Sequence, residues 1–496
     1  MSDRPPNIIF LMTDQHRHDA LGCVNPIVKT PNLDRLAAAG VRFSQATCNV
    51  PACVPSRYSM MTGLYGFQSG FRHNTAQAIR DEQLPVPLLP QYLAAAGYQT
   101  AGFGKTHWWD TQGVPPPTPS RRGFEVRAIA RSRASDEVEP EAVMWDDDDP
   151  ASCATYQQEV SEWGRGQGSP AALQGRQSVL SPLHTREGWL TRQALRFLDD
   201  GRDATRPLFL YLSFDYPHAG FNMPDGPYES WYDLDALPDP PLDLSLDPQR
   251  EHVGKDSRFE AWQQMTPRQR RLTTLRYYAI CSYVDDLFGR VLARLRETGE
   301  LEHSLIVFLS DHGEMLGDRR HMFDKFCLYE GSVRVPVIMS GSALPTDRRG
   351  VVDDRPAELV DVLPTLLHAA GVEQPDALPG RSLLAQPCRV GQYAEMHGRG
   401  YERHQIAPTL MWRAWPWKLI LHLPGFTYDA QCRLGECIGE LYNLQRDPTE
   451  LTNLFHDPDA LTTRNQLTQQ LTLHLACAAA RYPARVGRPD LTIPRP

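Results

Sequence analysis

The stretch Asn7–Asp14 reads NIIFLMTD, a continuous apolar run that ends in a threonine and an acid. Such a run is typical of a parallel strand whose two faces are both covered. The stretches Pro207–Phe214 (PLFLYLSF) and Leu305–Ser310 (LIVFLS) have the same character and predict two more buried strands. Together the three runs indicate a sheet in the interior of the protein.

Helical segments alternate with strands over the first 385 residues. A long helix is predicted from about Arg268 to Thr298, because its apolar residues recur at helical spacing. We expect a shorter helix from Pro31 to Gly40, with Thr30 as its cap. Further helices are expected at Gln91–Ala96 and Leu359–Ala370, and further strands at Val41–Cys48 and Tyr98–Phe103. The alternation predicts an α/β domain over residues 1–385, with a large, mostly parallel sheet sandwiched by helices.

This domain contains two predicted insertions, at about 111–185 and 222–265, which are rich in proline and acids. Long irregular segments in a compact protein are usually lids or binding loops. After about residue 386 the pattern changes to short strands, Gln392–Met396 and Trp417–His422, and a late helix at Thr462–Ala479. We expect residues 386–496 to form a smaller α+β domain with an antiparallel sheet.

The composition excludes several classes of protein. The 496 residues carry a formal net charge of −9 without a basic block, which does not favour nucleic-acid binding. No apolar run reaches the about 18 residues that a membrane helix needs, and no signal peptide precedes Asn7. We therefore interpret the ten cysteines as mostly reduced thiols of a cytoplasmic protein, with Cys432 and Cys437 as loop cysteines rather than zinc ligands.

The stretch Pro51–Gly63, PACVPSRYSMMTG, is the most informative for chemistry. Pro55 suits a first helical turn, which places Cys53 at a helix N-terminus, where free N–H groups favour a thiolate or a bound oxyanion. Arg57 lies four residues later on the same helix face and offers a fork of donors for a tetrahedral anion. The spacing alone is equally compatible with a buried cysteine beside a structural arginine.

The run Cys53-x-Pro-Ser-Arg57, followed by Met61-Thr62-Gly63, resembles the signature of the sulfatase family, C-x-P-S-R-x-x-x-[LM]-T-G. The resemblance implies an alkaline-phosphatase-like α/β fold. It also implies that a separate maturation enzyme converts Cys53 to formylglycine, whose hydrate supplies the nucleophilic oxygen. Near the C-terminus, GELYNLQRDPTELTNL (439–454) is similar to a hairpin of sulfatase C-terminal domains, so the resemblance extends from residue 7 to about 455.

Two pairs of polar residues follow predicted strands: Asp14-Gln15 after the first, and Asp311-His312 within SDHGEMLGD. Neighbouring strand ends are the usual place for a site, and adjacent side chains can reach one ion only where a strand ends. In sulfatases these positions bind a divalent cation beside the modified cysteine, here Cys53. The resemblance implies calcium, and the donors also suit magnesium or manganese. Gln15 departs from the commonest pattern and resembles the Gln/His branch of the superfamily.

Further residues match functional positions of the family in chain order. Gly104-Lys105-Thr106-His107 resembles a G-K-x-H segment, and on an extended chain Lys105 and His107 face one way. His218, after Pro217, and Lys325, after Asp324, resemble a second catalytic histidine and lysine. Asn74 falls where relatives carry an amide in the pocket, so we expect it to bind substrate.

The resemblance also implies a role for each of these side chains. Arg57 and Lys105 neutralise the sulfuryl oxygens together with the metal. His218 and Lys325 protonate or stabilise the leaving alcohol, and His107 removes the proton whose loss expels sulfate from the covalent hemiacetal.

The chain is therefore expected to be a sulfuric ester hydrolase that acts on organic sulfate monoesters. The nearest alternative is a phosphonate monoester or phosphodiester hydrolase of the same superfamily, which typically has hydroxyl side chains in place of Lys105 and His107. A transferase or a metal-free binding protein is disfavoured, because no expected catalytic position is missing. The alcohol half of the substrate is not indicated: Trp108 and Trp109 could equally form an aromatic wall or belong to the core. The oligomeric state cannot be read from the sequence.

Overall fold

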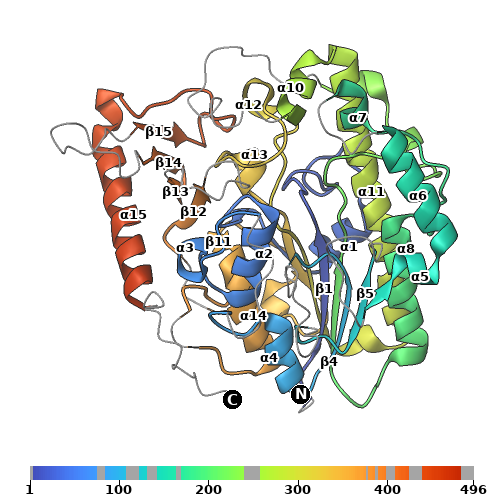
Figure 1. Ribbon diagram of the computed structural model, residues 1–496. Helices are drawn as coiled ribbons and strands as arrows, with labels where there is room; N and C mark the ends of the chain where they lie inside the picture. Colours follow the sequence, from blue (N-terminus) through green and yellow to red (C-terminus); the bar gives the residue numbers. More distant parts are fainter. Residues whose placement is uncertain are drawn as a thin grey trace.

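The computed structural model describes residues 4–74, 84–107, 122–130, 142–163, 169–238, 257–375, 378–385, 389–397, 408–423 and 438–481. Within these ranges the largest sheet has nine strands in the order β10-β2-β9-β8-β1-β7-β4-β5-β6 (Figure 1). Their bounds are β1 Asn7–Thr13, β2 Val41–Phe43, β4 Gln99–Gly104, β5 Val126–Ile129, β6 Val143–Met144, β7 Leu208–Ser213, β8 Ser304–Ser310, β9 Val337–Ser340 and β10 Val351–Asp353.

The centre of this sheet is β1, which pairs in parallel with β7 on one side and β8 on the other. Every residue of the three strands is buried, as their continuous apolar sequences predict. Among the described strands of this sheet, only β9 runs antiparallel to its neighbours, β2 and β8. The prediction of a large, mostly parallel sheet is confirmed.

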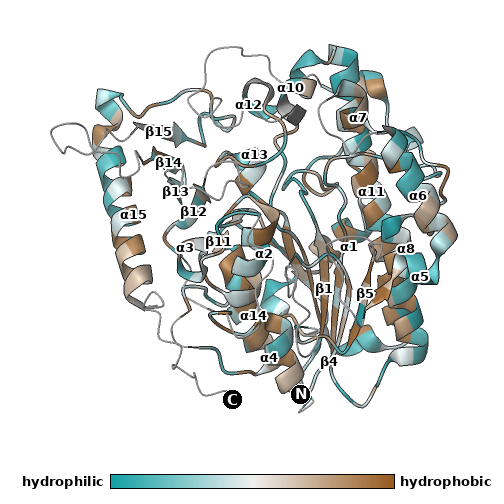
Figure 2. Ribbon diagram, viewed as in Figure 1, coloured by the Kyte–Doolittle hydropathy of each residue, from teal (hydrophilic) through white to brown (hydrophobic). Residues whose placement is uncertain are grey.

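Helices cover both faces of the sheet, and the side chains of β1 alternate between the two cores. Ile8, Phe10 and Met12 pack on the face covered by α2 (Cys53–Thr62), α4 (Leu89–Ala95) and α14 (Val362–Ala370). Ile9 and Leu11 pack on the face covered by α1 (Pro31–Ala39), α8 (Arg186–Arg196) and α11 (Pro267–Glu297). Figure 2 shows the strands of this sheet as the most continuously hydrophobic part of the fold.

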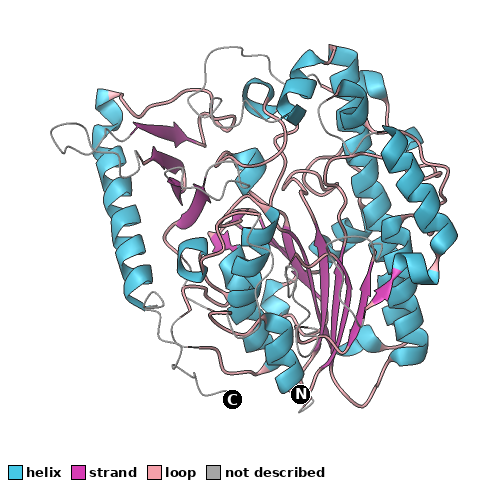
Figure 3. Ribbon diagram, in the orientation of Figure 1, coloured by secondary structure: helices cyan, strands magenta, loops and turns pink. Residues whose placement is uncertain are grey.

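A second, antiparallel sheet lies toward the C-terminus (Figure 3). Its described strands are β12 (Gln392–His397), β13 (Pro408–Ala414), β14 (Trp417–His422) and β15 (Ile438–Asn443), in that order. The helix α15 (Leu461–Arg481) packs against β13 and β14. The expectation of a small antiparallel C-terminal unit is confirmed, whereas a domain boundary at residues 385/386 stays a prediction.

Two local predictions are wrong. Val41–Cys48 is not one strand: β2 ends at Phe43, and β3 (Ala46–Thr47) pairs with β11 (Ala357–Glu358) in a separate small sheet. Thr30 does not cap α1, because its hydroxyl is bonded to the Asp34 carboxylate and the backbone N–H of Gly22. The carboxylate of Asp285 instead accepts the N–H groups of Asn32 and Leu33, at 3.0 and 2.7 Å.

The first predicted insertion is also more regular than expected. It contains α5 (Trp145–Asp148), α6 (Pro150–Trp163) and α7 (Pro170–Gln174), because Trp145, Cys153 and Leu173 are buried in the core beside α11. Residues 239–256 of the second insertion, together with Trp108, Trp109, Cys432 and Cys437, lie outside the described residues. None of the described helices is long and apolar enough to span a membrane.

Short helices complete the described structure. The α-helical ones are α3 (Gly66–Ser69), α10 (Ser257–Gln264), α12 (Asp318–His321) and α13 (Glu330–Val333). The others are η2 (Phe197–Gly201), η3 (Glu229–Trp231), η4 (Leu234–Ala236), η5 (Glu300–His303), η6 (Thr346–Arg348), η7 (Leu359–Asp361) and η8 (Pro458–Ala460).

Candidate active site and metal centre

The ends of two central strands supply the floor of the candidate site. Asp14 and Gln15 follow β1, and Asp311 and His312 follow β8. Because β1 and β8 are parallel neighbours in register, the two pairs leave the sheet side by side. Gln15 has a φ of 66°, so the chain leaves the strand direction directly after Asp14.

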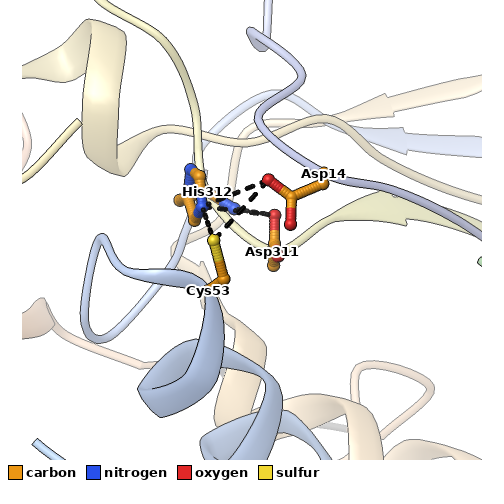
Figure 4. A group of neighbouring side chains, drawn as sticks. All are labelled: Asp14, Cys53, Asp311 and His312. Atoms are coloured by element: carbon orange, nitrogen blue, oxygen red, sulfur yellow. Dashed lines mark hydrogen bonds and ion pairs between the residues drawn. The ribbon is translucent and has the colours of Figure 1, made fainter. Parts of the chain in front are cut away.

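Four of the predicted metal-site residues converge at these strand ends. Figure 4 shows Asp14, Cys53, Asp311 and His312 pointing toward one another, with one donor atom of each within 4.8 Å of the others. All four side chains are buried. The Nε2 atom of His312 lies 3.6 Å from Oδ1 of Asp14 and 3.6 Å from Oδ1 of Asp311. Donor atoms of two carboxylates, an imidazole and a thiol therefore lie close together in the interior of the protein.

Cys53 is the first residue of α2, as its position before Pro55 predicts. Its Sγ lies 3.2 Å from Nε2 of His312 and 3.7 Å from Oδ1 of Asp14. The start of α2 is held by Asn74, whose Oδ1 accepts the N–H of Val54 at 3.1 Å. Asn74 thus contacts the helix that carries Cys53, and its predicted contact with substrate stays a prediction.

Arg57 binds the acids of the site. Its Nε donates to Oδ2 of Asp311 at 2.7 Å, and its Nη2 lies 3.3 Å from Oδ2 of Asp14. Nη1 donates to the carbonyl of Lys105 at 2.7 Å and to the hydroxyl of Ser213 at 3.0 Å. The guanidinium therefore fixes both aspartates, which explains why a buried arginine stands four residues after Cys53.

Lys105 bridges two acids at the end of β4. Its Nζ lies 2.7 Å from Oδ2 of Asp14 and 2.9 Å from Oδ1 of Asp215. Burial acts to lower the pKa of Lys105, but Asp14 and Asp215 outweigh it and raise that pKa above its usual range, so the lysine is charged. Asp215 also pairs with Nη1 of Arg186 at 2.8 Å.

The electrostatics keep Asp14 ionised as well. Burial acts to raise the pKa of Asp14, but the positive charges of Lys105, Lys325 and the histidines hold it well below its usual range. Burial opposes a charge on His312, yet the carboxylate of Asp311 raises the pKa of His312.

Lys325 contacts the site at Gln15 and Cys53. Its Nζ lies 2.8 Å from Oε1 of Gln15 and 3.1 Å from Sγ of Cys53. The amide nitrogen of Gln15 donates to the carboxylates of Glu314 and Asp324, the latter at 3.0 Å. Burial, together with the charge of Asp324, raises the pKa of Glu314 to about 7. Because its nitrogen is held by two carboxyl groups, Gln15 presents its oxygen to Lys325.

The two predicted catalytic histidines follow strands of the central sheet, His107 after β4 and His218 after β7. His107 has a φ of 57°, so the chain from Lys105 to His107 does not continue the strand β4, and a common direction of the two side chains stays a prediction. Burial, Lys105 and Arg57 hold the pKa of His107 well below its usual value. His218 is only half-buried, and its Nδ1 lies 3.3 Å from the carbonyl of Ala219.

Sequence reasoning missed three charged residues that contact the predicted site, and a fourth, Arg186, that pairs with one of them. Signals existed for three of them, since Asp215 comes two residues after β7, Glu314 follows His312 by two, and Asp324 precedes Lys325. Arg186 had no such signal, because it lies at the start of α8 inside a predicted irregular insertion.

The donor set fits a hard divalent cation. Asp14 and Asp311 offer carboxylate oxygens, His312 an imidazole nitrogen, and the amide of Gln15 is oriented by Glu314 and Asp324. Oxygen-rich sites of this kind suit calcium or magnesium, and one imidazole also admits manganese. The second oxygen of each aspartate is occupied by Arg57 or Lys105, which orients both carboxylates.

Comparisons with known proteins agree over nearly the whole chain. The sequence model of the sulfatase family matches residues 6–372, and that of the N-sulphoglucosamine sulphohydrolase C-terminal family matches residues 317–476. An arylsulfatase of Clostridium perfringens is 30% identical over 92% of this chain and 91% of its own length. An uncharacterized sulfatase of Escherichia coli, YidJ, is 28% identical over 94% of this chain and 86% of its own length.

Among solved structures, a phosphonate monoester hydrolase of Agrobacterium radiobacter has a similar fold. It aligns with a TM-score of 0.74 over 95% of this chain and 96% of its own, at 24% identity.

Proposed function

The chain belongs to the sulfatase family of enzymes, and from that premise we propose that it cleaves organic sulfate monoesters by means of a formylglycine at position 53 and one divalent cation. The observation that carries this proposal is the convergence of Cys53 with Asp14, Asp311 and His312 within 4.8 Å. The thiol stands at a helix N-terminus, where anionic groups are stabilised, and beside the donor set of a cation. A cysteine with a purely structural role would not need cation-binding side chains around its thiol.

The proposed modification explains why a cysteine occupies this position. A maturation enzyme would oxidise the thiol to an aldehyde, and the hydrated aldehyde next to a cation supplies an acidified hydroxyl as the nucleophile. Calcium is the ion that we propose, with magnesium or manganese as alternatives. The cation would be held by Asp14, Gln15, Asp311 and His312.

Charge recognition of the sulfuryl group is assigned to two lysines. Nζ of Lys105 lies 2.7 Å from Oδ2 of Asp14, and Nζ of Lys325 lies 3.1 Å from Sγ of Cys53. Arg57 has donors committed to Asp14, Asp311 and two further oxygens, so its main effect is to orient the acids and add positive charge nearby. Positive groups fixed in advance stabilise charge that develops on the transferred group.

Proton transfer is assigned to the histidines. The low pKa of His107 leaves its imidazole neutral near pH 7, so it can accept the proton from the hydroxyl group of the covalent hemiacetal. His218 lies after β7 on a half-buried stretch, which suits contact with the leaving alcohol. Lys325 can support His218 by stabilising negative charge on the leaving oxygen. Asn74 is proposed to contact substrate in addition to holding the start of α2.

A phosphonate monoester or phosphodiester hydrolase is the second candidate, favoured by the fold similarity to such an enzyme. The feature that argues for sulfate esters is the pair Lys105 and His107, where we expect hydroxyl side chains in the phosphorus-specific relatives. The choice of alcohol, whether aryl, alkyl or carbohydrate, is left open by this argument.

The test compares matched substrates on one preparation. Enzyme produced together with a formylglycine-generating enzyme is assayed with an aryl sulfate, the corresponding aryl phosphonate monoester and the corresponding diester. We expect the highest kcat/KM for the sulfate. A higher kcat/KM for either phosphorus ester would overturn the assignment in favour of the second candidate.

A further inference from the structure

The loop that carries Lys325 has an unusual backbone. Between Asp311-His312 and α13, four residues that are not glycine have positive φ: Leu316 (46°), Arg319 (45°), Asp324 (72°) and Phe326 (68°). Residues with a Cβ atom rarely adopt this conformation, because the Cβ crowds the following carbonyl oxygen. Such a backbone persists only where surrounding contacts impose it, and it is found mostly at functional sites.

The antiparallel C-terminal sheet provides one set of these contacts through Arg319. The guanidinium of Arg319 is buried over the ring of Tyr329, 3.7 Å from its centroid, and over the ring of Tyr442, 5.0 Å away. It donates to the hydroxyl of Tyr442 at 2.8 Å and to the carbonyl of Glu450, and it lies 3.4 Å from Oε2 of Glu440. Tyr329 donates to the same oxygen of Glu440 at 2.9 Å. We call Arg319, Tyr329, Glu440 and Tyr442 the clamp cluster.

A second buried contact fixes the end of the loop. Glu330, the first residue of α13, binds Arg413 at 2.9 Å and Lys418 at 3.2 Å, and both partners belong to the C-terminal sheet. Its own N–H donates to Glu450 at 2.8 Å. Figure 1 shows α13 between the C-terminal strands and the central sheet.

The other end of the loop is held by the α/β domain. Nη1 of Arg17 donates to the carbonyls of Glu314 and Met315, at 2.8 and 3.0 Å. Within the loop, the N–H of Met315 donates to the carbonyl of Asp324 at 3.0 Å. Lys325 thus follows Asp324, which bonds to the part of the loop held by the α/β domain. It precedes Tyr329 and Glu330, which contact the C-terminal sheet.

We infer that the C-terminal sheet is a positioning element of the active site, in which Arg319 and its clamp cluster hold the strained loop so that Lys325 reaches Cys53. Arg319 is a positioning residue, because it acts on Lys325 through the backbone of the loop and its contacts with the clamp cluster. The catalytic part of this inference rests on the role proposed for Lys325 above.

A double-mutant cycle tests this coupling. In the wild-type background, Lys325→Ala is expected to lower kcat by about 100-fold or more, as the loss of a positioned catalytic group does. Arg319→Met removes the clamp and is expected to lower kcat by about 10- to 100-fold with KM changed by less than about 3-fold, because a displacement of about 1 Å can cost that much. The double variant should then lose about as much kcat as Lys325→Ala alone, rather than the product of the two single losses, because Arg319 acts through the lysine.

Matched variants separate positioning from general damage. Arg464→Met is the control, because Arg464 also lies on an aromatic ring, 4.9 Å from the centroid of Phe455, and donates to a carbonyl at 2.7 Å, but far from the loop in sequence. It should keep the kcat of the wild type. Arg319→Lys retains the charge and should restore part of the kcat that Arg319→Met loses. If Arg319→Met does not fold, Tyr442→Phe enters the same cycle with a smaller expected loss of a few-fold.

Amide hydrogen exchange gives a readout that does not depend on turnover. Residues 316–328 should exchange faster in Arg319→Met than in the wild type, while the strand β1 keeps its protection. Unchanged exchange in this loop, or losses in the cycle that multiply in full, would overturn the inference. If the wild type hydrolysed no sulfate or phosphorus ester, the proposed function would fail, and exchange would still decide whether the sheet holds the loop.

Discussion

The candidate metal centre and the clamp cluster are two groups of buried polar side chains on either side of one loop. In the metal centre, the acids Asp14 and Asp311 turn one oxygen each toward the imidazole of His312 and the thiol of Cys53. In the clamp cluster, Arg319 lies at the centre, and a carboxylate, two aromatic rings and backbone oxygen surround it. Both groups are buried and charged, but in the first group the donor atoms of Asp14, Cys53, Asp311 and His312 lie within 4.8 Å of one another.

The difference teaches how a functional charge cluster can be told from a structural one. Burial and pKa shifts occur in both and do not distinguish them, since the pKa of Glu440 is lowered as that of Asp14 is. The arrangement of donors does distinguish them: the clamp cluster satisfies its own charges, whereas the metal centre brings several acceptors to one point. Substitutions in the first group should therefore remove the chemistry directly, whereas substitutions in the second should cost stability and lower kcat only through the position of Lys325.

The largest expected effect is on the metal-centre side. Cys53→Ala should lower kcat by at least about 10⁴-fold, because loss of a nucleophile removes most of the rate enhancement. The matched control is Cys281→Ala, a buried cysteine on α11 away from the site, which should lose stability but keep kcat. Steady-state kinetics and thermal unfolding of both variants check the pair. Comparable kcat losses in the two variants would refute a special role for Cys53.

Next in size is the dependence on the cation. Asp311→Asn keeps the shape of the side chain but removes one anionic ligand, so the purified variant should hold far less calcium than the wild type and lose activity. Asp361→Asn is the control, because Asp361 is equally buried but pairs with Arg389, at 2.8 Å, outside the centre. It should keep its metal. Elemental analysis after dialysis measures both, and chelation of the wild type should abolish turnover. A chelated enzyme with full activity would contradict the metal assignment.

A stability effect is expected on the clamp side. Burial acts to raise the pKa of Glu440, but a hydrogen bond from His422 and the charge of Arg319 lower it from its usual 4.5 to about 2. A lowered carboxyl pKa adds stability above pH 4.5, and that stability is lost as the pH falls from about 4.5 to about 2. At about 1.4 kcal/mol per pKa unit, the contribution is about 3 kcal/mol.

Glu440→Gln should remove this contribution. Denaturant unfolding at several pH values between 2 and 7 should show a smaller acid-dependent loss in the variant than in the wild type. Parallel curves for the two proteins would show that Glu440 does not contribute in this way.

The smallest expected effect concerns Asn74, which lies beside the metal centre. Asn74→Ala removes the acceptor of the Val54 N–H and should destabilise the protein by about 1 kcal/mol, as the loss of a helix cap does. If Asn74 also contacts substrate, as proposed, KM should rise at the same time. Asn74→Asp keeps the accepting oxygen and should retain the stability of the wild type. A raised KM in Asn74→Asp would therefore report the loss of the substrate contact and not a loss of stability.

The sequence allowed the centre of the fold to be predicted because burial leaves a strong signal there. The strands β1, β7 and β8 are continuous apolar runs, and the residues after β1 and β8 are polar, so a parallel sheet with a site at its edge follows. The strand β13 was not predicted. Its sequence, PTLMWRA, carries a proline and an arginine, and that arginine, Arg413, is buried in contact with Glu330 and Gln392 from distant parts of the chain.

The same limit applies to the site. Cys53, Asp14 and Asp311 stand in motifs, and the structure brings them together. The pairing of Lys105 with Asp215, and the hold of Glu314 and Asp324 on Gln15, depend on contacts between segments far apart in the chain. Thr30 has the sequence of a helix cap, yet the carboxylate of Asp285 from α11 takes that place. Local sequence cannot indicate which distant side chain competes for a backbone N–H.

The fraction of chains with an aldehyde at position 53 should set the activity of any preparation. Enzyme is made with graded amounts of the maturation enzyme, and the peptide that contains residue 53 is quantified by mass spectrometry beside kcat for an aryl sulfate. We expect kcat to rise in proportion to the aldehyde fraction and to vanish where only the thiol is found. Full turnover by protein that carries an unmodified Cys53 would contradict the proposed chemistry.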